Sequence, residues 1–246
     1  MSQPFLAVII PAYNEDQRIL PTLERVREYL SIQAYTWSVT LVSDGSSDKT
    51  VDLAKGFAEK NPNFHVIHYS PNRGKGYAVR KGMLEVEGDW ILFSDADLAA
   101  PIEEVEKLIE HAEAGDDVSI GSRPLKESKL EIHQPFYREM LGCGFNLAVH
   151  LLAIRGIHDT QCGFKLFSKK AARDVFSRCK LEGFSFDFEA LMIARDLGYR
   201  IDEVPIRWRH QEGSKVVLMR DGPRMLRDLV KLRFWGKKKR LRPNAG

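Results

Sequence analysis

The sequence is poor in cysteine, and its three cysteines form no motif. Cys143, Cys162 and Cys179 are odd in number and include no C-x-x-C pair, which excludes a disulfide framework and a cysteine zinc site. A reduced, cytoplasmic compartment is the location we expect from this usage. The seven histidines show no metal-ligand spacing either, and we interpret them as structural or surface residues.

Long apolar runs are also missing. No stretch reaches the ~18 uncharged apolar residues that a membrane-spanning helix needs. Residues 1–4 lead directly into an apolar segment with no basic stretch before it, so we expect no secretory signal. The 246 residues, 43% of them hydrophobic, suffice for a full core, which excludes disordered, collagen-like and disulfide-miniprotein classes.

The formal net charge is only +3, but the charge is unevenly placed. Residues 231–246 carry seven basic side chains and no acidic one, so the rest of the chain is mildly acidic. A basic tail suits phosphate-rich partners, either nucleic acid or anionic lipid headgroups. Nucleic acid is the weakest option, because these basic residues sit at one end without interleaved stacking positions, and we expect no nucleic-acid partner.

Short apolar runs alternate with helical spacing along the first 120 residues. Residues 5–10 form an apolar run that stops at Pro11, and residues 17–31 have the spacing of an amphipathic helix. Strands are expected again near 38–43, 65–69 and 90–93, and helices from about 48, 76 and 101. The alternation predicts an α/β fold with a Rossmann-like, mostly parallel sheet flanked by helices.

The pattern changes after residue 121. Helices are expected over 136–154 and 186–197, and strands over 163–167 and 201–208. No clean linker separates this part from the first, and we interpret it as an appended C-terminal region.

Two carboxylates directly follow the apolar segment 90–93. Ligands of parallel α/β sheets bind at the carboxyl ends of the strands, where Asp95 and Asp97 are expected. Magnesium typically takes one or two carboxylates together with substrate phosphates, so this pair suits a metal that bridges a diphosphate. A solvated turn is the alternative.

Two further loops are expected at the same edge. We expect Asp44 to accept hydrogen bonds from a nucleobase or ribose, and Asp48 to cap the following helix. Residues 72–76, Asn-Arg-Gly-Lys-Gly, form a basic loop whose backbone donors and cations are expected to face phosphate, with a plain turn as the alternative. The loop matches neither G-x-G-x-x-G nor G-x-x-x-x-G-K-[ST], which disfavours dinucleotide oxidoreductases and Walker-type NTPases.

Together these loops resemble the family-2 inverting glycosyltransferases of GT-A fold, whose members begin with a loop like Pro11-Ala12-Tyr13-Asn14-Glu15. The segments at 44–46, 74–76 and 95–98 follow in the order of that family's nucleotide, loop and metal motifs. Segments 121–123, 159–165 and 213–215 are similar to the polyprenol-phosphate branch, particularly the dolichyl-phosphate β-glucosyltransferases. The resemblance covers residues 5 to about 217. It implies a catalytic domain over 1–217, with a nucleotide-sugar half to about 122 and an acceptor half over 123–217, before an amphipathic helix and basic tail over 218–246.

The resemblance implies a role for each matching residue. The residues implied to bind the nucleotide-sugar donor are Pro11, Ala12, Tyr13, Glu15, Asp44, Gly45, Lys75, Asp95, Ala96 and Asp97. Asp95 and Asp97 are implied to bind the metal cofactor, Mg²⁺ or Mn²⁺. The residues implied to bind the acceptor and its phosphate are Arg123, Arg138, Gln161, Lys165, Ser214 and Lys215. The catalytic set is Asp95, Asp97, Asp187, Arg123 and Lys165, with a helix cap as the alternative role of Asp187.

The implied activity is transfer of glucose from UDP-glucose, with inversion, to a polyprenyl phosphate. Another sugar nucleotide such as GDP-mannose, a soluble acceptor, and an inactive nucleotide-sugar-binding or lipid-binding module are the alternatives. Ala99 stands where related mannose synthases often have a polar side chain, which disfavours a metal site of that type. Residues 161–165 are not the Gln-x-x-Arg-Trp motif of processive members, which disfavours polymerisation.

A lipid acceptor requires contact with a membrane, and two segments are candidates for it. One is the apolar helix expected over 136–154. The other is the apolar stripe within residues 225–235, which runs into the basic cluster 237–242. Such segments can lie on the cytoplasmic face of a membrane as a peripheral attachment, with core packing as the alternative for both.

Overall fold

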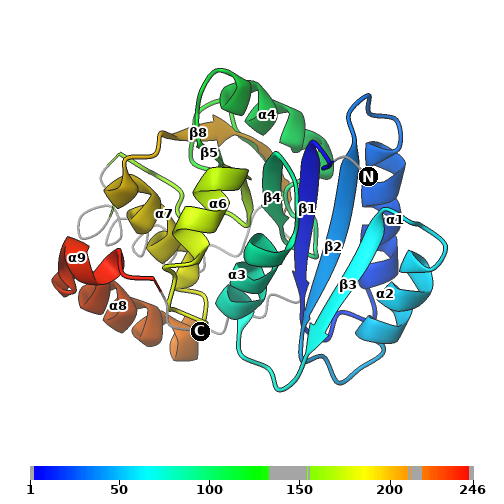
Figure 1. Ribbon diagram of the computed structural model, residues 1–246, viewed down its shortest axis with the longest axis horizontal. Coiled ribbons are helices and arrows are strands. Elements are labelled where there is room, and N and C mark those ends of the chain that lie inside the picture. The colour runs from blue at the N-terminus through cyan, green and yellow to red at the C-terminus, as the bar shows by residue number, and fades with distance from the viewer. Residues whose placement is uncertain (1–2, 133–153, 155, 210, 212–217, 244–246) are drawn as a thin grey trace.

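The computed structural model describes residues 3–132, 154, 156–209, 211 and 218–243 (Figure 1). A seven-stranded sheet in the order β3-β2-β1-β4-β7-β5-β8 forms its centre. The strands are β1 (Leu6–Ala12), β2 (Trp37–Asp44), β3 (Phe64–Tyr69), β4 (Trp90–Ser94), β5 (Val118–Ser122), β7 (Phe164–Ser168) and β8 (Ile201–Pro205). Only β7 runs antiparallel to its neighbours, β4 and β5, so the predicted mostly parallel sheet is confirmed.

Helices cover both faces of this sheet. In Figure 1, α3 and α6 lie in front of it. On one face lie α1 (Ile19–Leu30), α2 (Thr50–Ala58), the 3-10 turn η1 (Ile102–Glu104) and α4 (Val105–Glu113). On the other lie α3 (Lys75–Glu85), α6 (Lys169–Phe176), α7 (Phe186–Leu197) and α8 (Leu218–Phe234), which α9 (Gly236–Arg240) follows.

Strand β1 shows why residues 5–10 of the sequence form a continuous apolar run. All seven of its residues are buried, with Leu6, Val8 and Ile10 in the core beneath α1 and Ala7 and Ile9 in the core beneath α3. A strand covered by helices on both faces needs apolar side chains at every position.

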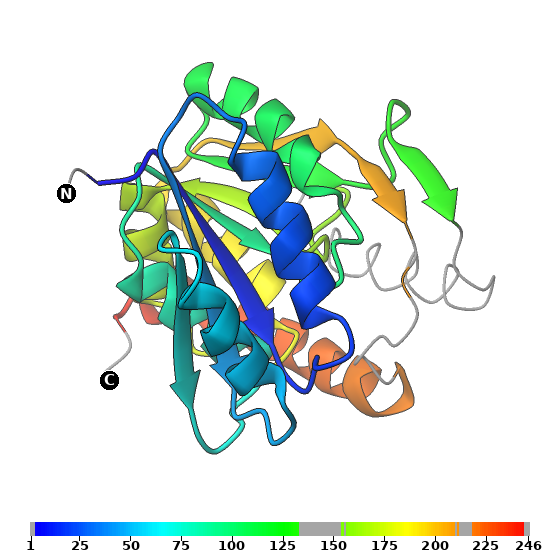
Figure 2. The same ribbon diagram turned by 90° about the vertical axis from the view of Figure 1, so that its right-hand side faces the viewer.

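The strand predicted over 201–208 is wrong as a single element. It divides into β8 and β9 (Arg207–Arg209), and β9 pairs with β6 (Lys129–Ile132) in a separate two-stranded sheet at the upper right of Figure 2. Pro205 ends β8 because it has no amide hydrogen to continue the ladder. Strands β5 and β6 and helix α6 were not predicted from the sequence.

Two predictions concern the C-terminal region. The sheet runs across residue 122, with β7 inserted between β4 and β5, so the division into two halves stays a prediction. The helix expected over 136–154 lies outside the described residues except for Ile154, which is buried. Searching residues 3–132, 156–209 and 218–243 finds no helix that combines the length and apolar character needed to cross a membrane.

Candidate active site

The carboxyl ends of β1, β2 and β4 open into a cavity of 670 Å³, within the size range of small-molecule sites. Nine residues predicted to bind the donor line it: Pro11, Ala12, Tyr13, Glu15, Asp44, Lys75, Asp95, Ala96 and Asp97. Helix α8 and residues 183–185 line it as well. The fold therefore brings together, at one edge of the sheet, predicted donor-binding residues that are up to 86 positions apart in the sequence.

Asp95 and Asp97 lie directly after β4. Lys75 Nζ lies 2.6 Å from Asp95 Oδ1, and Asp97 Oδ1 accepts a hydrogen bond from the backbone N of Ala99 at 3.0 Å. Burial and then the charge of Asp95 raise the pKa of Asp97. Burial alone would lower the pKa of Lys75, but the Asp95 and Asp187 carboxylates outweigh it and hold that pKa above its usual value.

This donor set fits a hard divalent cation. Two carboxylates of one turn share a partly buried site, and their mutual repulsion favours a cation beside them. In the structure Lys75 supplies part of that positive charge.

Asp44 organises the glycine-rich loop. The carboxylate, in a residue 3% exposed, accepts four hydrogen bonds, from Tyr69 Oη, Asn72 Nδ2, Arg73 N and Gly74 N, each 2.8 Å long. The backbone N of Gly76 donates to Glu182 O at 2.8 Å. These backbone donors are used within the fold, so the prediction that they face phosphate is wrong for residues 73, 74 and 76, while the Lys75 side chain lines the cavity.

Gly45 lies against the same loop. Its φ is +66°, and a Cβ there would come within 2.6 Å of the backbone N of Asn72. Asp48, three residues on, accepts a hydrogen bond at 3.0 Å from the backbone N of Thr50, the first residue of α2, which is the capping role predicted for it.

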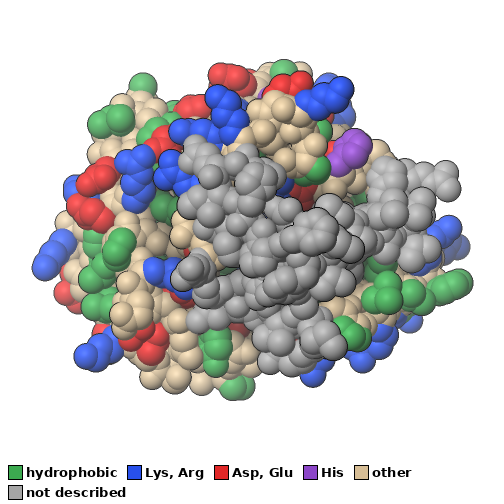
Figure 3. Space-filling view, turned by 180° about the vertical axis from the view of Figure 1, so that it is seen from behind, with side chains coloured by type: hydrophobic (Ala, Val, Ile, Leu, Met, Phe, Trp, Pro, Cys, Tyr) green, Lys and Arg blue, Asp and Glu red, His purple; other side chains and the backbone are tan. Residues whose placement is uncertain are grey.

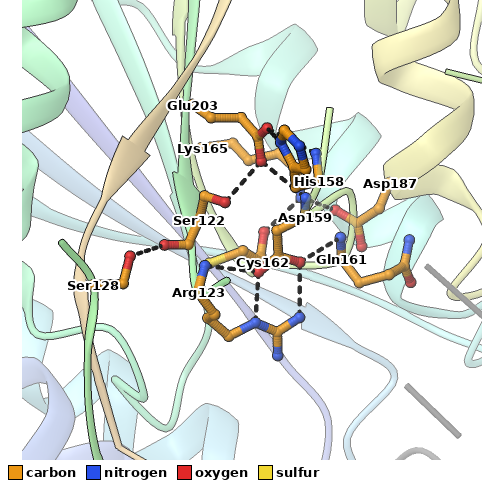
Figure 4. A network of polar contacts seen from close by, with 10 residues as sticks. All are labelled: Ser122, Arg123, Ser128, His158, Asp159, Gln161, Cys162, Lys165, Asp187 and Glu203. Carbon is orange, nitrogen blue, oxygen red and sulfur yellow. Dashed lines mark hydrogen bonds and ion pairs between the residues drawn. The ribbon is translucent and has the colours of Figure 1, made fainter. Parts of the chain in front are cut away.

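A polar network holds Arg123 at the end of β5 (Figure 4). Asp159, whose side chain is fully buried, accepts two hydrogen bonds from the Arg123 guanidinium, at 2.6 Å from Nε and 2.8 Å from Nη2. Glu203 of β8 in turn accepts from Ser122 Oγ at 2.7 Å and from the backbone N of Asp159 at 2.8 Å. Burial would raise the pKa of Asp159, but the charge and hydrogen bonds of Arg123, together with the charge of Lys165, outweigh it and lower that pKa.

Lys165 and Asp187 form a buried ion pair, with side chains 2% and 5% exposed. Lys165 Nζ also donates to the carbonyl of Cys162. Burial raises the pKa of Asp187, although Lys165 and Lys75 act against it. Asp187 is the second residue of α7, and its carboxylate accepts a hydrogen bond from Lys165 Nζ. The alternative of a simple helix cap is therefore wrong.

The predicted site residues therefore fall into three groups. Nine line the cavity, as given above. Five are described but are not among its lining residues: Gly45, Arg123, Gln161, Lys165 and Asp187. Arg138, Ser214 and Lys215 lie outside the described residues.

Part of the cavity wall was not predicted from the sequence. Lining residues outside the predicted loops include Arg18, Ser185, Asp221, Arg224, Arg227 and Asp228, while Asn72 and Gly74 belong to the predicted loop 72–76. The signal was present in α8, because positions 221, 224, 225 and 228 have the i, i+3, i+4, i+7 spacing of one helix face.

A second group of metal-type ligands lies at the opposite edge of the sheet. His111, Asp116 and Asp202 approach one another near the amino ends of β5 and β8. His111 Nδ1 lies 2.7 Å from Asp202, and Arg200 pairs with Asp116 at 3.2 Å. This cluster is thus separate from Asp95 and Asp97.

Comparison with known proteins identifies the family. Residues 7–176 match glycosyl transferase family 2. The chain belongs to this family. Solved structures of glucosyl-3-phosphoglycerate synthase from Mycobacterium tuberculosis share its fold, and the complex with Mn²⁺, UDP and phosphoglyceric acid aligns with a TM-score of 0.70 at 15% identity, over 99% of this chain and 81% of that one. The predicted GT-A fold is confirmed.

Sequence relatives of this family-2 glycosyltransferase are similar over most of their length. A dolichyl-phosphate β-glucosyltransferase of Drosophila melanogaster is 39% identical, over 91% of this chain and 73% of the relative. The enzyme of that name from Saccharomyces cerevisiae is 38% identical, over 94% of this chain and 74% of the relative. The one from Homo sapiens is 35% identical, over 93% of this chain and 75% of the relative. The predicted resemblance is confirmed.

Proposed function

We propose that this glycosyltransferase transfers glucose from UDP-glucose, with inversion, to the phosphate of a dolichyl-type polyprenyl phosphate. The observation that carries the proposal is the convergence of nine predicted donor-binding residues on one cavity, in a chain whose relatives share the name dolichyl-phosphate β-glucosyltransferase. We also propose that the strand-end loops before residue 122 bind the donor and that later residues bind the acceptor, where residues 183–185 and α8 line the same cavity.

On the donor side, Asp95 and Asp97 would hold Mg²⁺ or Mn²⁺. When bound, the cation neutralises negative charge that develops on the departing nucleoside diphosphate. Lys75 contributes positive charge at the same place, because its ammonium already lies against Asp95. Tyr13 and Asp44 line the part of the cavity assigned to the nucleoside. The Asp44 carboxylate already accepts four hydrogen bonds within the fold, so a bond from Asp44 to the nucleoside stays a prediction.

On the acceptor side, the nucleophile needs little activation. A phosphate monoester is largely ionised at neutral pH, so its oxygen can attack the anomeric carbon without a strong general base. The task of the protein is placement, since a correctly positioned nucleophile accounts for much of the rate. Attack opposite the leaving diphosphate converts an α-linked donor into a β-linked lipid phosphate. From the family resemblance we assign phosphate binding to Arg123, which Asp159 orients, and a positioning role to the buried Lys165–Asp187 pair; none of these side chains lines the cavity itself.

The lipid acceptor implies a peripheral enzyme at the cytoplasmic face of a membrane. The basic C-terminal helices supply the charge for such a contact.

The experiment is an assay of purified protein with UDP-glucose, Mg²⁺ or Mn²⁺ and polyprenyl phosphate in liposomes, read by mass spectrometry of the lipid, with Asp97→Ala as the control variant. Glucosylated lipid from the wild type alone supports the proposal. Hydrolysis of UDP-glucose that depends on Asp97, without lipid product, would point to a soluble acceptor. Product from GDP-mannose in place of UDP-glucose would change the sugar assignment.

A further inference from the structure

Helix α8 has apolar side chains on two faces. Met225, Leu229 and Leu232 are buried and at most 9% exposed. Leu226, Val230 and Phe234 are 47%, 42% and 84% exposed. These three, which we call the outer ridge, are four residues apart and therefore line one side of the helix. An amphipathic helix that only covers a core would place polar residues there.

Basic side chains border the outer ridge. Arg227, Lys231 and Arg233 of α8 are exposed, and Lys237 to Lys239 follow in α9. Residues 229–246 contain no acidic side chain. Hydrophobic and basic side chains lie together at the lower right of Figure 3, the end of the molecule that α8 and α9 occupy. Apolar side chains flanked by Lys and Arg, with no acid, match the boundary between acyl chains and anionic headgroups.

The same helix forms a wall of the active-site cavity. Arg224, Arg227 and Asp228 line it, and Asp228 Oδ2 accepts a hydrogen bond of 2.9 Å from Ser185 Oγ, just before α7. Arg227 Nη2 lies 3.5 Å from Asp228 Oδ1, whereas in the described part of the chain no carboxylate pairs with Arg224. Two exposed guanidinium groups therefore stand between the outer ridge and the cavity.

We propose that the outer ridge of α8 inserts into the headgroup boundary of an anionic membrane, and that Arg224 and Arg227 bind the phosphate of the lipid acceptor as it enters the cavity. The membrane contact stands on the surface of α8 alone. The role of the two arginines rests on the proposed function.

Vesicle sedimentation tests the outer ridge without catalysis. The probe is vesicles of phosphatidylcholine with and without phosphatidylglycerol. We expect the wild type to sediment with the anionic vesicles, and the triple variant Leu226→Ser, Val230→Ser, Phe234→Ser to bind roughly tenfold more weakly. Ile32→Ser removes a 78% exposed apolar side chain just after α1, on the other face of the sheet, and should bind like the wild type. A triple variant that binds like the wild type, or a wild type that binds neither vesicle, overturns the proposal.

Kinetics on two acceptors separate the ridge from the arginines. With a short-chain, water-soluble prenyl phosphate, the ridge variant should keep the wild-type kcat and KM, whereas with long-chain acceptor in vesicles its apparent KM should rise about tenfold. Equal loss on both acceptors would show that the ridge serves the fold instead.

The paired change Arg224→Gln, Arg227→Gln should raise the KM for the short-chain acceptor roughly tenfold or more and leave the KM for UDP-glucose unchanged. Lys60→Gln, an exposed charge just after α2, is the control for lost charge. An unchanged acceptor KM overturns the role of the arginines. If the wild type makes no product from either acceptor, the proposed function and with it this role fail, while sedimentation still decides the membrane contact.

Discussion

Gly163 lies against the carboxylate of Asp95, so closely that a Cβ on Gly163 would come within 2.0 Å of Asp95 Oδ2 and 2.4 Å of Cγ. The backbone N of Asp95 also donates to the carbonyl of Gly163 at 3.1 Å. Gly163 directly precedes β7, the antiparallel strand beside β4, so the sheet itself holds the two residues together. The side-chain position of a proposed metal ligand thus depends on a missing methyl group 68 residues away in the sequence.

We expect Gly163→Ala to displace the Asp95 carboxylate. Because a misplacement of about 1 Å can cost ~100-fold in rate, kcat/KM should fall by roughly that factor. The Mn²⁺ concentration for half-maximal rate should rise, and calorimetric Mn²⁺ affinity in the presence of UDP should fall. Gly56→Ala is the control, because nothing lies within 4 Å of a Cβ at that position in α2. Unchanged Mn²⁺ affinity in Gly163→Ala would show that Asp95 does not bind the metal.

The sequence predicted the donor side of the site better than the rest. Strands buried on both faces, such as β1 and β4, read as apolar runs, and their carboxyl ends must meet at one edge, so Asp44, Asp95 and Asp97 could be assigned to one site. The hydrogen-bond and ion-pair partners of the site residues could not be predicted from the sequence. Asp44 hydrogen-bonds loop 72–74 and Arg123 binds Asp159, contacts that depend on how separate loops pack and carry no signature in sequence spacing.

Helix α8 shows a different limit of prediction from the sequence. Its residues 225–235 read as one apolar stripe, but the structure divides it into a buried and an exposed face. Hydrophobicity alone does not distinguish a side chain that packs on the core from one that faces outward. That distinction depends on which side the sheet and α7 occupy.

The Arg123–Asp159 pair should be important for stability. Asp159→Asn leaves a guanidinium, 25% exposed, without its charged partner, so the free energy of unfolding should fall by about 3 kcal/mol in urea titration. Turnover should fall as well, because the guanidinium loses its orientation. Glu85→Gln breaks the surface Lys81–Glu85 pair and should change stability by less than about 1 kcal/mol. Equal effects of the two variants would contradict the structural role of Asp159.

The buried Lys165–Asp187 pair allows stability and catalysis to be separated. Asp187→Asn should slow turnover and lower the free energy of unfolding by about 3 kcal/mol, because Lys165 is left charged and buried, while the protein still folds. The double variant Lys165→Met, Asp187→Leu should recover stability, since an apolar pair can replace a buried ion pair. Its turnover should stay low. Wild-type turnover in the double variant would remove both residues from the mechanism.

Glu189 of α7 should make stability depend on pH. The residue is 1% exposed, and burial raises its pKa from 4.5 to about 7, although the backbone N of Lys180 and of Leu181 donates to its carboxylate. Between pH 4.5 and about pH 7 the folded protein keeps a proton on Glu189 that the unfolded chain has lost. The free energy of unfolding should therefore fall as the pH rises from 4.5 to about 7. Above about pH 7 the contribution of Glu189 should no longer change with pH. The full shift corresponds to about 3 kcal/mol. Urea titrations at pH 5 and pH 8 should show this loss in the wild type and in the exposed control Glu59→Gln, and a smaller one in Glu189→Gln. Equal pH dependence in all three proteins would assign the loss to other groups.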